Sequence, residues 1–506
     1  MGRVVSVYLP NWPTDRLRRT AGDAAPPDEA PMVVAGRVGN RRVVTAADAA
    51  AQGLGLHAGM PIASAQALVP GLVVVPADPA ADAASLERLA VWVMQRVSPI
   101  VAADPPDGIV LDATGADHLQ GGEEAMLEAL VGRLVMSGVT ARAAVAETWG
   151  AAHALARHGA APTLIAAPGA AEGVLAPLPL QALRLPPATV AGLRTLGFTR
   201  IGDLLGQPRA PLTRRFGLDL CRRLDQALGA TAEPIEPVRP EGLVEVRRVF
   251  AEPIAAPETI ARYIGKLVLT LCAQMEERGL GARRLDLFCH RINNDLQTVR
   301  VGLARPVRDA KPLTRLLCAR IETIDPGCGI EIMVLAATLA EPLEARQAAS
   351  LLEEPAPDLA GLIDTLANRV GAGAVYRIAS VPSDVPERSM RRIPALAEDA
   401  GDGWPGHWPR PARLLPRPQP IETMALLPDH PPAWFSWKGV RRRVRRADGP
   451  ERIFGEWWTR DAERAAVRDY FRVEDEAGER YWIYRAGDGE DAATGSHRWF
   501  LHGVFG

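Results

Sequence analysis

A short apolar run at residues 109–111, framed by two aspartates, constrains the fold of this chain more than any other stretch. The segment 105–115 reads PPDGIVLDATG. Its Ile-Val-Leu core is β-prone and the glycines around it favour turns, which predicts a short strand. Asp107 and Asp112 lie five residues apart, so on a regular strand their side chains point to opposite faces. An acidic residue at a strand end is more often a turn or edge residue than a metal ligand.

Strands and helices alternate on both sides of this segment, up to about residue 167. Apolar runs predict strands, and apolar residues at helical spacing predict helices. The expected elements are strands at 3–9, 72–75 and 140–146, a hairpin through 33–34 and 42–45, and helices at 46–53, 62–68, 82–98, 122–137 and 150–158. This order predicts an α+β domain over residues 1–167.

Residues 178–229 differ from this domain, because leucines and valines recur there at helical spacing between short breaks. The breaks fall at PPAT and at LGFTRIGDL, which predicts short helices joined by tight turns, a helix-hairpin-helix type of unit. Such units offer backbone N–H groups and helix N-termini to DNA phosphates. A plain helical subdomain is a serious alternative, because the PPAT turn lacks a glycine.

A second α+β unit is predicted for residues 243–342, after a proline-rich linker at 231–242. Strand-like VEVRRVF and RRLDLFCHRI alternate with helices expected at 257–279 and 312–321. Arginines cluster around these strands, at Arg283, Arg284, Arg291, Arg300, Arg305 and Arg308. A basic strand face suits contact with a phosphate backbone, and a solvated sheet face explains the arginines equally well.

The composition changes again beyond residue 343. An acidic segment at 343–360 is expected to be an exposed linker. Residues 361–433 form a C-terminal region that begins with a compact helix-turn-strand and is expected to be extended or partly disordered from residue 379, where prolines are frequent. Short aromatic strands such as RYWIYR predict a small β module at 434–506.

Aromatic and basic residues are concentrated in this last module. Its tryptophans are Trp434, Trp437, Trp457, Trp458, Trp482 and Trp499. Its basic run consists of Lys438, Arg441, Arg442, Arg443, Arg445 and Arg446. Aromatic rings and arginines together can stack on bases and hold a single strand. We expect most of the tryptophans, however, simply to form the core of a small domain.

The overall composition excludes a globally basic protein. A length of 506 residues predicts three or four domains, and a formal net charge of −2 leaves nucleic-acid binding to local patches. The five cysteines show no CxxC spacing, which indicates reduced thiols rather than a zinc site. Because neither a signal-peptide pattern nor a run of about 18 apolar residues occurs, we expect a cytoplasmic protein.

In the order of its elements the chain resembles the Y-family (UmuC/DinB-like) DNA polymerases over residues 3–342. Its ending, with ANRVGAGAVYRI, SDVPERSMRRIPA and RDYFRVEDEAGERYWIYR, is similar to the divergent ImuB-like members of that family. The resemblance implies a multidomain α+β fold with palm and fingers at 1–167, a helix-hairpin-helix-like thumb at 178–229, a little-finger domain at 243–342 and a C-terminal extension with an aromatic β-rich module.

The resemblance also implies that active-site residues are missing. Tyr8 stands where the family has an aspartate in the first palm strand. The family's Ser-Ile-Asp-Glu-Ala-aromatic-Leu-Asp pattern matches PPDGIVLDATG at Asp107, but Gly108 replaces the glutamate. The triphosphate-gripping Tyr-x-Ala-Arg pattern falls on Ala49–Gln52, and the lysine of a later Ala-Lys pair falls on His153.

These departures predict a polymerase fold without polymerase chemistry. Two-metal phosphoryl transfer needs several carboxylates to hold two Mg²⁺ ions about 3.5–4 Å apart, each in near-octahedral oxygen geometry. Asp107 alone cannot screen two divalent ions, so we interpret it as a remnant and expect no cofactor. The alternative is an active error-prone polymerase that uses Mg²⁺ through substitute ligands, for which the candidates are Asp15, Asp48, Asp104 and Glu147.

For such a protein the resemblance implies an adaptor in damage-induced (SOS) translesion synthesis and mutagenesis. It would hold primer-template DNA and would work with the replication sliding clamp, a DnaE-type error-prone polymerase and a RecA-like ImuA protein. A clamp-binding peptide of the Gln-x-x-hydrophobic type falls on Gln347, Ser350, Leu351 and Leu352, although the usual terminal Phe is missing and an ordinary linker explains these residues as well. A DNA-binding structural protein without a clamp partner is a further alternative.

Overall fold

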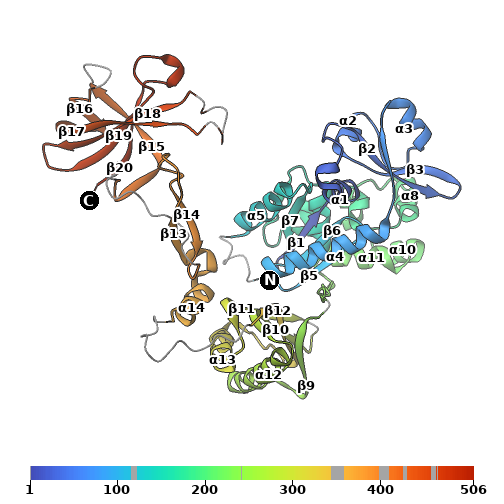
Figure 1. The fold of residues 1–506 in the computed structure, drawn as a ribbon. Coiled ribbons are helices and arrows are strands. Elements are labelled where there is room, and N and C mark those ends of the chain that lie inside the picture. The colour runs from blue at the N-terminus through green and yellow to red at the C-terminus, as the bar shows by residue number, and fades with distance from the viewer. Residues whose placement is uncertain are drawn as a thin grey trace. The chain divides into compact units, whose positions relative to one another are not determined.

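The computed structural model describes residues 2–505 except 115–121, 241, 294, 344–357, 398–409, 425–429, 457, 459–462 and 464. Contacts divide the chain into two compact units, Met1–Ala374 and Val375–Gly506, and each unit is described by itself (Figure 1). No helix in the described ranges combines the length and the apolar character that crossing a bilayer requires.

A five-stranded sheet in the order β5-β6-β1-β7-β8 forms the centre of the first unit. Its strands are β1 (Val4–Tyr8), β5 (Val101–Asp104), β6 (Gly108–Asp112), β7 (Arg142–Ala146) and β8 (Thr163–Ile165). β1 is antiparallel to both of its neighbours. Because side chains alternate along a strand, Val5 and Val7 pack on one face of the sheet while Val4 and Tyr8 pack on the other.

Helices cover both faces of this central sheet. The face of Val5 packs against α1 (Trp12–Ala21), α4 (Pro79–Arg96) and α5 (Glu123–Met136), and the opposite face packs against α6 (Trp149–His158). The helices predicted at 82–98, 122–137 and 150–158 are thereby confirmed. The buried side of α6 consists largely of alanines, which lets this helix lie close to the sheet.

A smaller sheet in the order β3-β2-β4 precedes α4 in the chain. It consists of β2 (Met32–Val38), β3 (Arg41–Ala47) and β4 (Val73–Pro76), accompanied by η1 (Gly22–Ala24), α2 (Ala49–Gly53) and α3 (Ile62–Leu68). The predicted hairpin is confirmed, because β2 and β3 pair antiparallel.

Short helices follow β8, as the leucine spacing predicted. They are α7 (Ala171–Leu175), η3 (Leu180–Leu183), α8 (Pro187–Thr195), α9 (Gly202–Leu205), α10 (Arg209–Phe216) and α11 (Leu218–Leu228). Their leucines share one core with the alanines of α6. The cluster therefore packs on the side of the central sheet that carries Tyr8.

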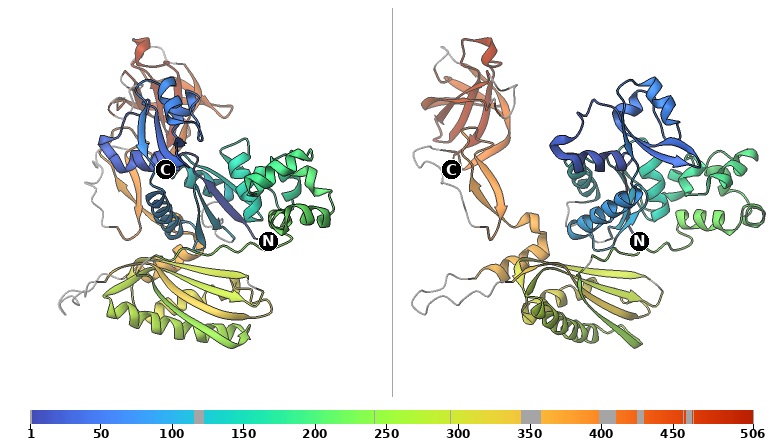
Figure 2. Two further views of the ribbon diagram at one scale, coloured as in Figure 1. Left: turned by 90° about the vertical axis from the view of Figure 1, so that its right-hand side faces the viewer. Right: turned by 45° about the vertical axis from the view of Figure 1, so that its right-hand side comes forward.

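Residues 244–342 of the first unit form a four-stranded antiparallel sheet with two helices on one face (Figure 2). In spatial order its strands are β11 (Leu296–Val307), β10 (Leu280–Arg291), β12 (Ile330–Pro342) and β9 (Val244–Ile254). The helices are α12 (Pro257–Glu277) and α13 (Ala310–Cys318), with η4 (Ile321–Thr323) after them. None of the described helices between residues 244 and 342 packs on the other face of this sheet.

The helix α14 (Ala360–Val370) covers the free edge of β11 and is followed by η5 (Ala372–Ala374). The Asn368 side chain accepts from the Gly302 N–H at 2.9 Å and donates to the Gly302 carbonyl at 2.7 Å. Asp364 accepts from the Ala304 N–H at 2.6 Å. These side chains satisfy backbone groups that an edge strand would otherwise leave unpaired.

The second unit is a closed barrel preceded by the hairpin β13 (Tyr376–Ser380) and β14 (Met390–Pro394). The barrel strands are β15 (Arg413–Met424), β16 (Trp434–Trp437), β17 (Val440–Phe454), β18 (Val467–Asp475), β19 (Arg480–Ala486) and β20 (Trp499–Val504), with η7 (Ala492–Thr494) before the last. Aromatic side chains such as Phe435, Phe471 and Tyr481 form its core.

One expectation about this unit is wrong. The sequence predicted that the β module begins at 434, but β15 pairs with both β20 and β16 and belongs to the barrel. Within 379–433, β14 and β15 are extended strands. The β15 prolines Pro416 and Pro418 fall where the pairing with β20 shifts register, so they interrupt no ladder. The module therefore begins at the start of β15.

The tryptophans of the barrel divide between core and surface. Trp482 and Trp499 are buried in its hydrophobic clusters, as expected. Trp434 and Trp437 are half-buried, and Trp458 is 70% exposed. Trp457 lies outside the described residues.

Candidate functional site

The two positions that the family resemblance marks as lost carboxylates lie directly opposite each other. Tyr8 ends β1, Gly108 begins β6, and the two residues are cross-strand partners. The Leu9 N–H donates to the Asp107 carbonyl at 2.8 Å and fixes this end of the strand pair. Tyr8, Asp104, Asp107, Gly108 and Arg157 are referred to below as the sheet-end site.

An arginine from α6 fills the centre of the sheet-end site. Arg157 Nη2 lies 2.7 Å from Asp107 Oδ1 and 3.5 Å from Asp104 Oδ2. The guanidinium carbon lies 4.8 Å from the centroid of the Tyr8 ring. A Cβ atom at Gly108 would lie 2.7 Å from Arg157 Nη2, closer than real Cβ contacts come. The missing side chain at position 108 thus leaves the space that the guanidinium occupies.

The surroundings of Arg157 keep the other groups of the site neutral or paired. Burial raises the pKa of Asp104, and the nearby Arg157 opposes that rise. Burial raises the pKa of Tyr8 as well, and the charge of Asp107 adds to the shift, so Tyr8 remains an uncharged phenol. Burial and the neighbouring arginines lower the pKa of His153 to about 2, so this imidazole is neutral at pH 7.

The residues of the sheet-end site do not fit a pair of magnesium ions. Two-metal catalysis requires several carboxylate oxygens that converge on both ions. Here Asp107 is ion-paired, Tyr8 offers a neutral phenol and Gly108 offers no side chain. A divalent cation would have to displace the Arg157 guanidinium. Within the described part of the chain, no three His, Cys, Asp or Glu side chains are grouped in a way that could hold a metal ion.

Three of the four substitute ligands have other roles in the fold. Asp15 accepts from the Thr140 N–H at 2.7 Å, and burial raises its pKa to about 6. Asp48 caps α2 by accepting from the Ala51 N–H at 2.8 Å and is also paired with Arg18 at 2.7 Å. Glu147 accepts from the Gly169 N–H at 2.7 Å. Only Asp104 lies beside Asp107, and it shares the same arginine.

The positions matched to the triphosphate-binding residues carry no cation. Ala49 begins α2. Gln52, at the place of the family's arginine, donates to the Asn11 side chain at 2.9 Å and to the Ala47 carbonyl at 2.7 Å. His153 is buried, with Nε2 3.8 Å from Asp104 Oδ2. These contacts hold α2 and α6 in the fold.

Beside the sheet-end site lies a polar hollow of about 690 Å³. Its ionisable lining residues are Asp104, Asp107, His153, Arg157, Arg184, Arg223 and Glu233. Glu233, from the proline-rich linker, is paired with Arg184 at 2.6 Å and with Arg223 at 2.7 Å. Sequence reasoning missed all three arginines. The one available signal was that Arg157 lies four residues after His153, on the same face of a helix.

Most arginines predicted to contact DNA from the four-stranded sheet have carboxylate partners. Arg283 lies 3.7 Å from Glu341, Arg291 lies 2.8 Å from Asp295, Arg300 lies 2.7 Å from Asp286, Arg305 lies 3.9 Å from Asp358 and Arg308 lies 3.4 Å from Glu276. Arg284 differs from these: burial and the charge of Arg300 lower its pKa to about 10, so it stays a cation at pH 7. The DNA-contacting role of all these residues stays a prediction.

In the turn between α8 and α9, backbone N–H groups bind the carboxylate of Asp203, a residue of α9. Asp203 Oδ2 accepts from the Thr199 N–H at 2.7 Å and from the Arg200 N–H at 2.9 Å. These hydrogen bonds lower the pKa of Asp203. The two N–H groups of this turn are thus already satisfied, which weakens the case for a phosphate contact there.

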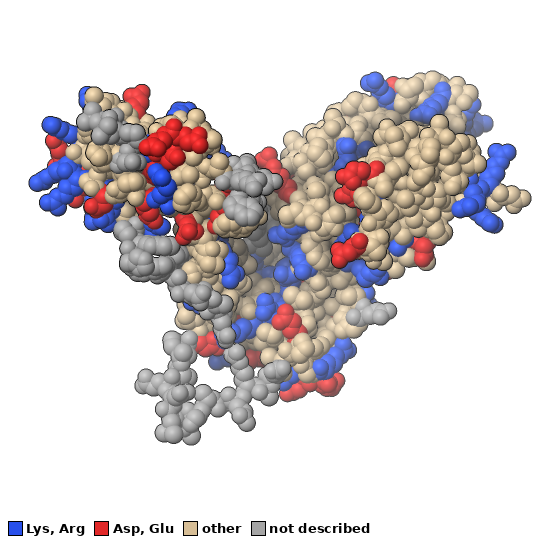
Figure 3. All heavy atoms as spheres, turned by 45° about the horizontal axis from the view of Figure 1, so that its top comes forward, with Lys and Arg blue, Asp and Glu red and all other residues tan. Residues whose placement is uncertain are grey.

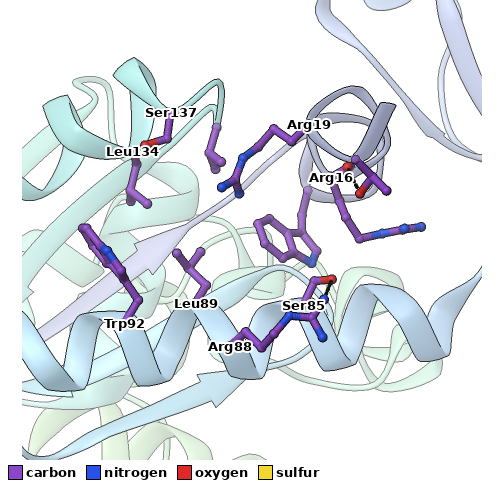
Figure 4. A pocket seen from close by; sticks show the side chains of 11 residues that line it. Arg16, Arg19, Ser85, Arg88, Leu89, Trp92, Leu134 and Ser137 are labelled. Atoms are coloured by element: carbon purple, nitrogen blue, oxygen red, sulfur yellow. Dashed lines mark hydrogen bonds between the residues drawn. The ribbon is translucent and has the colours of Figure 1, made fainter. Parts of the chain in front are cut away.

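A second hollow, of about 390 Å³, lies among α1, α4 and α5 on the other face of the central sheet (Figure 4). Its lining includes the apolar Trp12, Leu89, Trp92 and Leu134 and the basic Arg16, Arg19 and Arg88. Arg16 is ion-paired with Asp82 at 2.5 Å. None of the predicted site residues lies in this hollow.

The predicted clamp-binding residues Gln347, Ser350, Leu351 and Leu352 lie outside the described residues, as does Gly115 at the end of the PPDGIVLDATG segment. Their roles stay predictions. The described part of that segment ends in a turn in which Asp112 Oδ1 accepts from the Thr114 N–H at 2.8 Å.

Family comparisons match three parts of the chain. Residues 26–157 match the impB/mucB/samB family, residues 244–349 match the C-terminal domain of that family, and residues 417–505 match a domain of unknown function, DUF6504. The last match includes most of β15, in agreement with β15 as the first strand of the barrel.

Curated relatives extend these matches over most of the chain. The chain is 47% identical over 465 residues to Protein ImuB of Caulobacter vibrioides, which covers 90% of this chain and 100% of that protein. It is 28% identical to DNA polymerase IV of Ralstonia nicotianae, over 50% of this chain and 71% of that protein. Among solved structures, an insertion ternary complex of Dbh DNA polymerase aligns with 66% of this chain and 98% of its own, at 16% identity and a TM-score of 0.39.

Proposed function

Because the chain belongs to the ImuB family and has a Y-family polymerase fold with a β-rich C-terminal extension, we propose that it is a DNA-bound adaptor in translesion synthesis that does not extend DNA itself. The observation that carries the proposal is the Arg157 guanidinium between Asp104 and Asp107. A positive charge stands where the chemistry would need two divalent cations. Tyr8 and Gly108 supply no carboxylate to compete for them.

DNA binding is expected to reside in the polymerase-like part of the chain. On the face of the four-stranded sheet opposite α12 and α13, Arg284 stays cationic and Arg247 is exposed on β9, opposite Val334. Cations that bind phosphates release counterions, so affinity for primer-template DNA should fall steeply with salt. Replacement of both residues by glutamate should lower that affinity and flatten the salt dependence.

Recruitment is the second part of the proposed role. The clamp-binding peptide would be Gln347–Leu352, in which Leu351 and Leu352 supply apolar side chains for a pocket of the sliding clamp. The C-terminal extension would provide the docking surface for a DnaE-type error-prone polymerase and a RecA-like ImuA protein. Such an arrangement would bring an active polymerase to a damaged primer-template without any chemistry in this chain.

Primer extension tests the missing chemistry. Purified full-length protein is incubated with Mg²⁺, all four nucleotides and a primed template, next to the Asp107→Ala variant as a matched control. We expect no extended product from either protein, while fluorescence anisotropy shows both bound to the template. Extension by the wild type that disappears in Asp107→Ala would contradict the proposal and support the active polymerase.

A pull-down with the sliding clamp tests recruitment. Leu351→Ala with Leu352→Ala should abolish clamp binding, because both apolar anchors are removed. The control is Leu359→Ala with Leu362→Ala, which removes two exposed leucines just beyond the proposed peptide and should leave clamp binding intact. Equal binding of both double variants would show that the peptide lies elsewhere, and no binding by the wild type would remove the clamp from the proposal.

A further inference from the structure

The first two strands after the N-terminal strand of the barrel form a tight, strongly basic hairpin at residues 434–446, called the basic hairpin below. Lys438 and Gly439 form its turn with φ of 50° and 76°, and Trp437 pairs with Val440 across the turn. Positive φ at both central residues is typical of the type I′ turn, which matches the twist of two paired strands. The turn therefore fixes which side chains of the hairpin point outward.

One side of the basic hairpin belongs to the barrel core. Phe435 is fully buried, and its cross-strand partner Arg442 lies over the Tyr481 ring at 4.9 Å. Arg442 is also paired with Asp475 at 2.8 Å and with Glu479 at 2.5 Å. Because residues alternate along a strand, Trp434 on β16 and Arg441 and Arg443 on β17 share the outer side. Arg445 is also exposed, at a register shift between Val444 and Arg446.

The cations of the outer side are largely unneutralised. The hairpin sequence WFSWKGVRRRVRR holds six basic residues and no acidic one. Arg443 lies 3.7 Å from Glu476, and both side chains are mostly exposed, so this pair is weak. Among the described residues, no carboxylate is ion-paired with Lys438, Arg441, Arg445 or Arg446. Lys and Arg side chains gather at the edge of the barrel that carries β16 and β17 (Figure 3).

Two of these cations lie on half-buried tryptophans. The Arg441 guanidinium carbon is 3.9 Å from the centroid of the Trp434 ring, and Lys438 Nζ is 4.6 Å from that of Trp437. The rings hold the basic groups at the surface and exclude water from one side of them. The flat Arg441 guanidinium on its aromatic support is well suited to stack on a base while neighbouring cations contact phosphates.

We propose that the basic hairpin is a binding site for single-stranded nucleic acid, recognised through its phosphates and bases without sequence preference. Arg441 and Arg443 lie two residues apart on β17, about 7 Å, which suits the successive phosphates of an extended strand, and Arg445 adds an exposed cation just beyond them. An acidic protein segment would use the charges but would have no use for the aromatic support. This site is separate from the DNA contacts proposed for the polymerase-like part and does not depend on them.

Anisotropy of a fluorescein-labelled oligo-dT with the full-length protein tests the site. Arg441→Glu with Arg443→Glu and Arg445→Glu should weaken binding at least about 10-fold and reduce the salt slope by about 2, since single strands contribute about 0.7 per phosphate contact. The control Arg441→Lys with Arg443→Lys and Arg445→Lys keeps every charge and should retain most of the affinity. Affinity for a blunt duplex should change much less than affinity for oligo-dT.

Three results would overturn the proposal. Unchanged oligo-dT affinity in the triple glutamate variant would place the binding elsewhere, for example on the four-stranded sheet. An equal loss in the lysine and glutamate variants would indicate damage to the barrel rather than lost phosphate contacts. Displacement of oligo-dT by poly-glutamate at the same charge concentration would show a general polyanion surface, as expected for an acidic protein partner.

Discussion

The sheet-end site and the basic hairpin contain the same pair of groups, an arginine over an aromatic ring, with opposite consequences. Arg157 lies 4.8 Å from the centre of the Tyr8 ring and also contacts two carboxylates. Arg441 lies 3.9 Å from the centre of the Trp434 ring and has no carboxylate at ion-pair distance among the described residues. The charge of Arg157 is matched by carboxylates within the protein, whereas the charge of Arg441 remains available to a ligand.

The difference teaches that neighbouring carboxylates and burial, rather than the arginine itself, decide what such a pair does. Only 12% of the Arg157 side chain is exposed, so its charge has to be matched by Asp104 and Asp107 inside the protein. Arg441 is exposed and solvated, so no internal partner is needed. The sheet-end site is thus part of the packing, while the basic hairpin carries cations that have no ion-paired carboxylate among the described residues.

The largest expected effect is on the free energy of unfolding, which should change much more when Arg157 is replaced than when Arg441 is replaced. Arg157→Met leaves two neighbouring carboxylates without their cation and should lower the free energy of unfolding by about 3 kcal/mol, as for other broken buried ion pairs. Arg441→Met removes a solvated charge and should change it by less than about 0.5 kcal/mol. Urea denaturation followed by circular dichroism and tryptophan fluorescence measures both variants.

Arg157→Lys is the control for this comparison, because it keeps the charge while losing the planar guanidinium. It should cost less than Arg157→Met. Equal stability of wild type and Arg157→Met would mean that the ion pairs of the sheet-end site contribute nothing, and the contrast with the basic hairpin would disappear.

A smaller effect is expected when the missing side chain is restored at Gly108. A Cβ atom there meets Arg157 Nη2 at 2.7 Å and the Asp104 carbonyl at 3.1 Å, so Gly108→Ala should lower the free energy of unfolding by about 2 kcal/mol. In the Arg157→Met background the same substitution should cost about 1 kcal/mol less, because part of the clash is gone. Strict additivity of the two changes would show that Arg157 does not occupy this space.

The smallest expected effect is a pH dependence of barrel stability. It tests whether burial keeps the His502 side chain uncharged. His502 is fully buried and its Nδ1 lies 2.7 Å from the Tyr470 hydroxyl; burial lowers its pKa to about 4, and Glu387 opposes the shift. A lowered histidine pKa means that the unfolded chain takes up the proton first, near pH 6.5. Stability should therefore fall by about 1 kcal/mol between pH 7 and pH 5.5.

The variant His502→Gln removes the titrating group and keeps a hydrogen-bonding partner for Tyr470. Its barrel unfolding should respond less to pH over this interval than that of the wild type. An identical pH response of the two proteins would assign the acid sensitivity to other groups.

Much of the fold could be predicted, because strong local patterns specify it. The apolar spacing at 122–137 corresponds to α5, and that at 257–279 corresponds to α12. β15 was missed because its prolines are typical of loops, whereas here Pro416 and Pro418 coincide with a shift in pairing register that no local pattern reveals. Proline is therefore weak evidence against a strand when the strand contains a pairing irregularity.

The departures at Tyr8 and Gly108 from the family pattern could be read from the sequence, but the contacts around them could not. Tyr8 and Gly108 are visible as departures from the family pattern, so the sequence already indicates a missing carboxylate pair. Arg157 is 50 residues from Asp107, and nothing in the sequence alone indicates that the two form an ion pair. The same holds for Glu233, which reaches Arg184 from 49 residues away. Long-range charge pairs depend on the assembled fold.

Binding of Mn²⁺, a paramagnetic substitute for Mg²⁺, tests the central claim most directly. Electron paramagnetic resonance counts the ions taken up by the protein with a chain-terminated primer-template and the matching nucleotide. Wild type and the variant Asp104→Asn with Asp107→Asn should take up the same amount, because Arg157 already holds both carboxylates in the wild type. Two further Mn²⁺ ions bound by the wild type and lost in the variant would contradict the account.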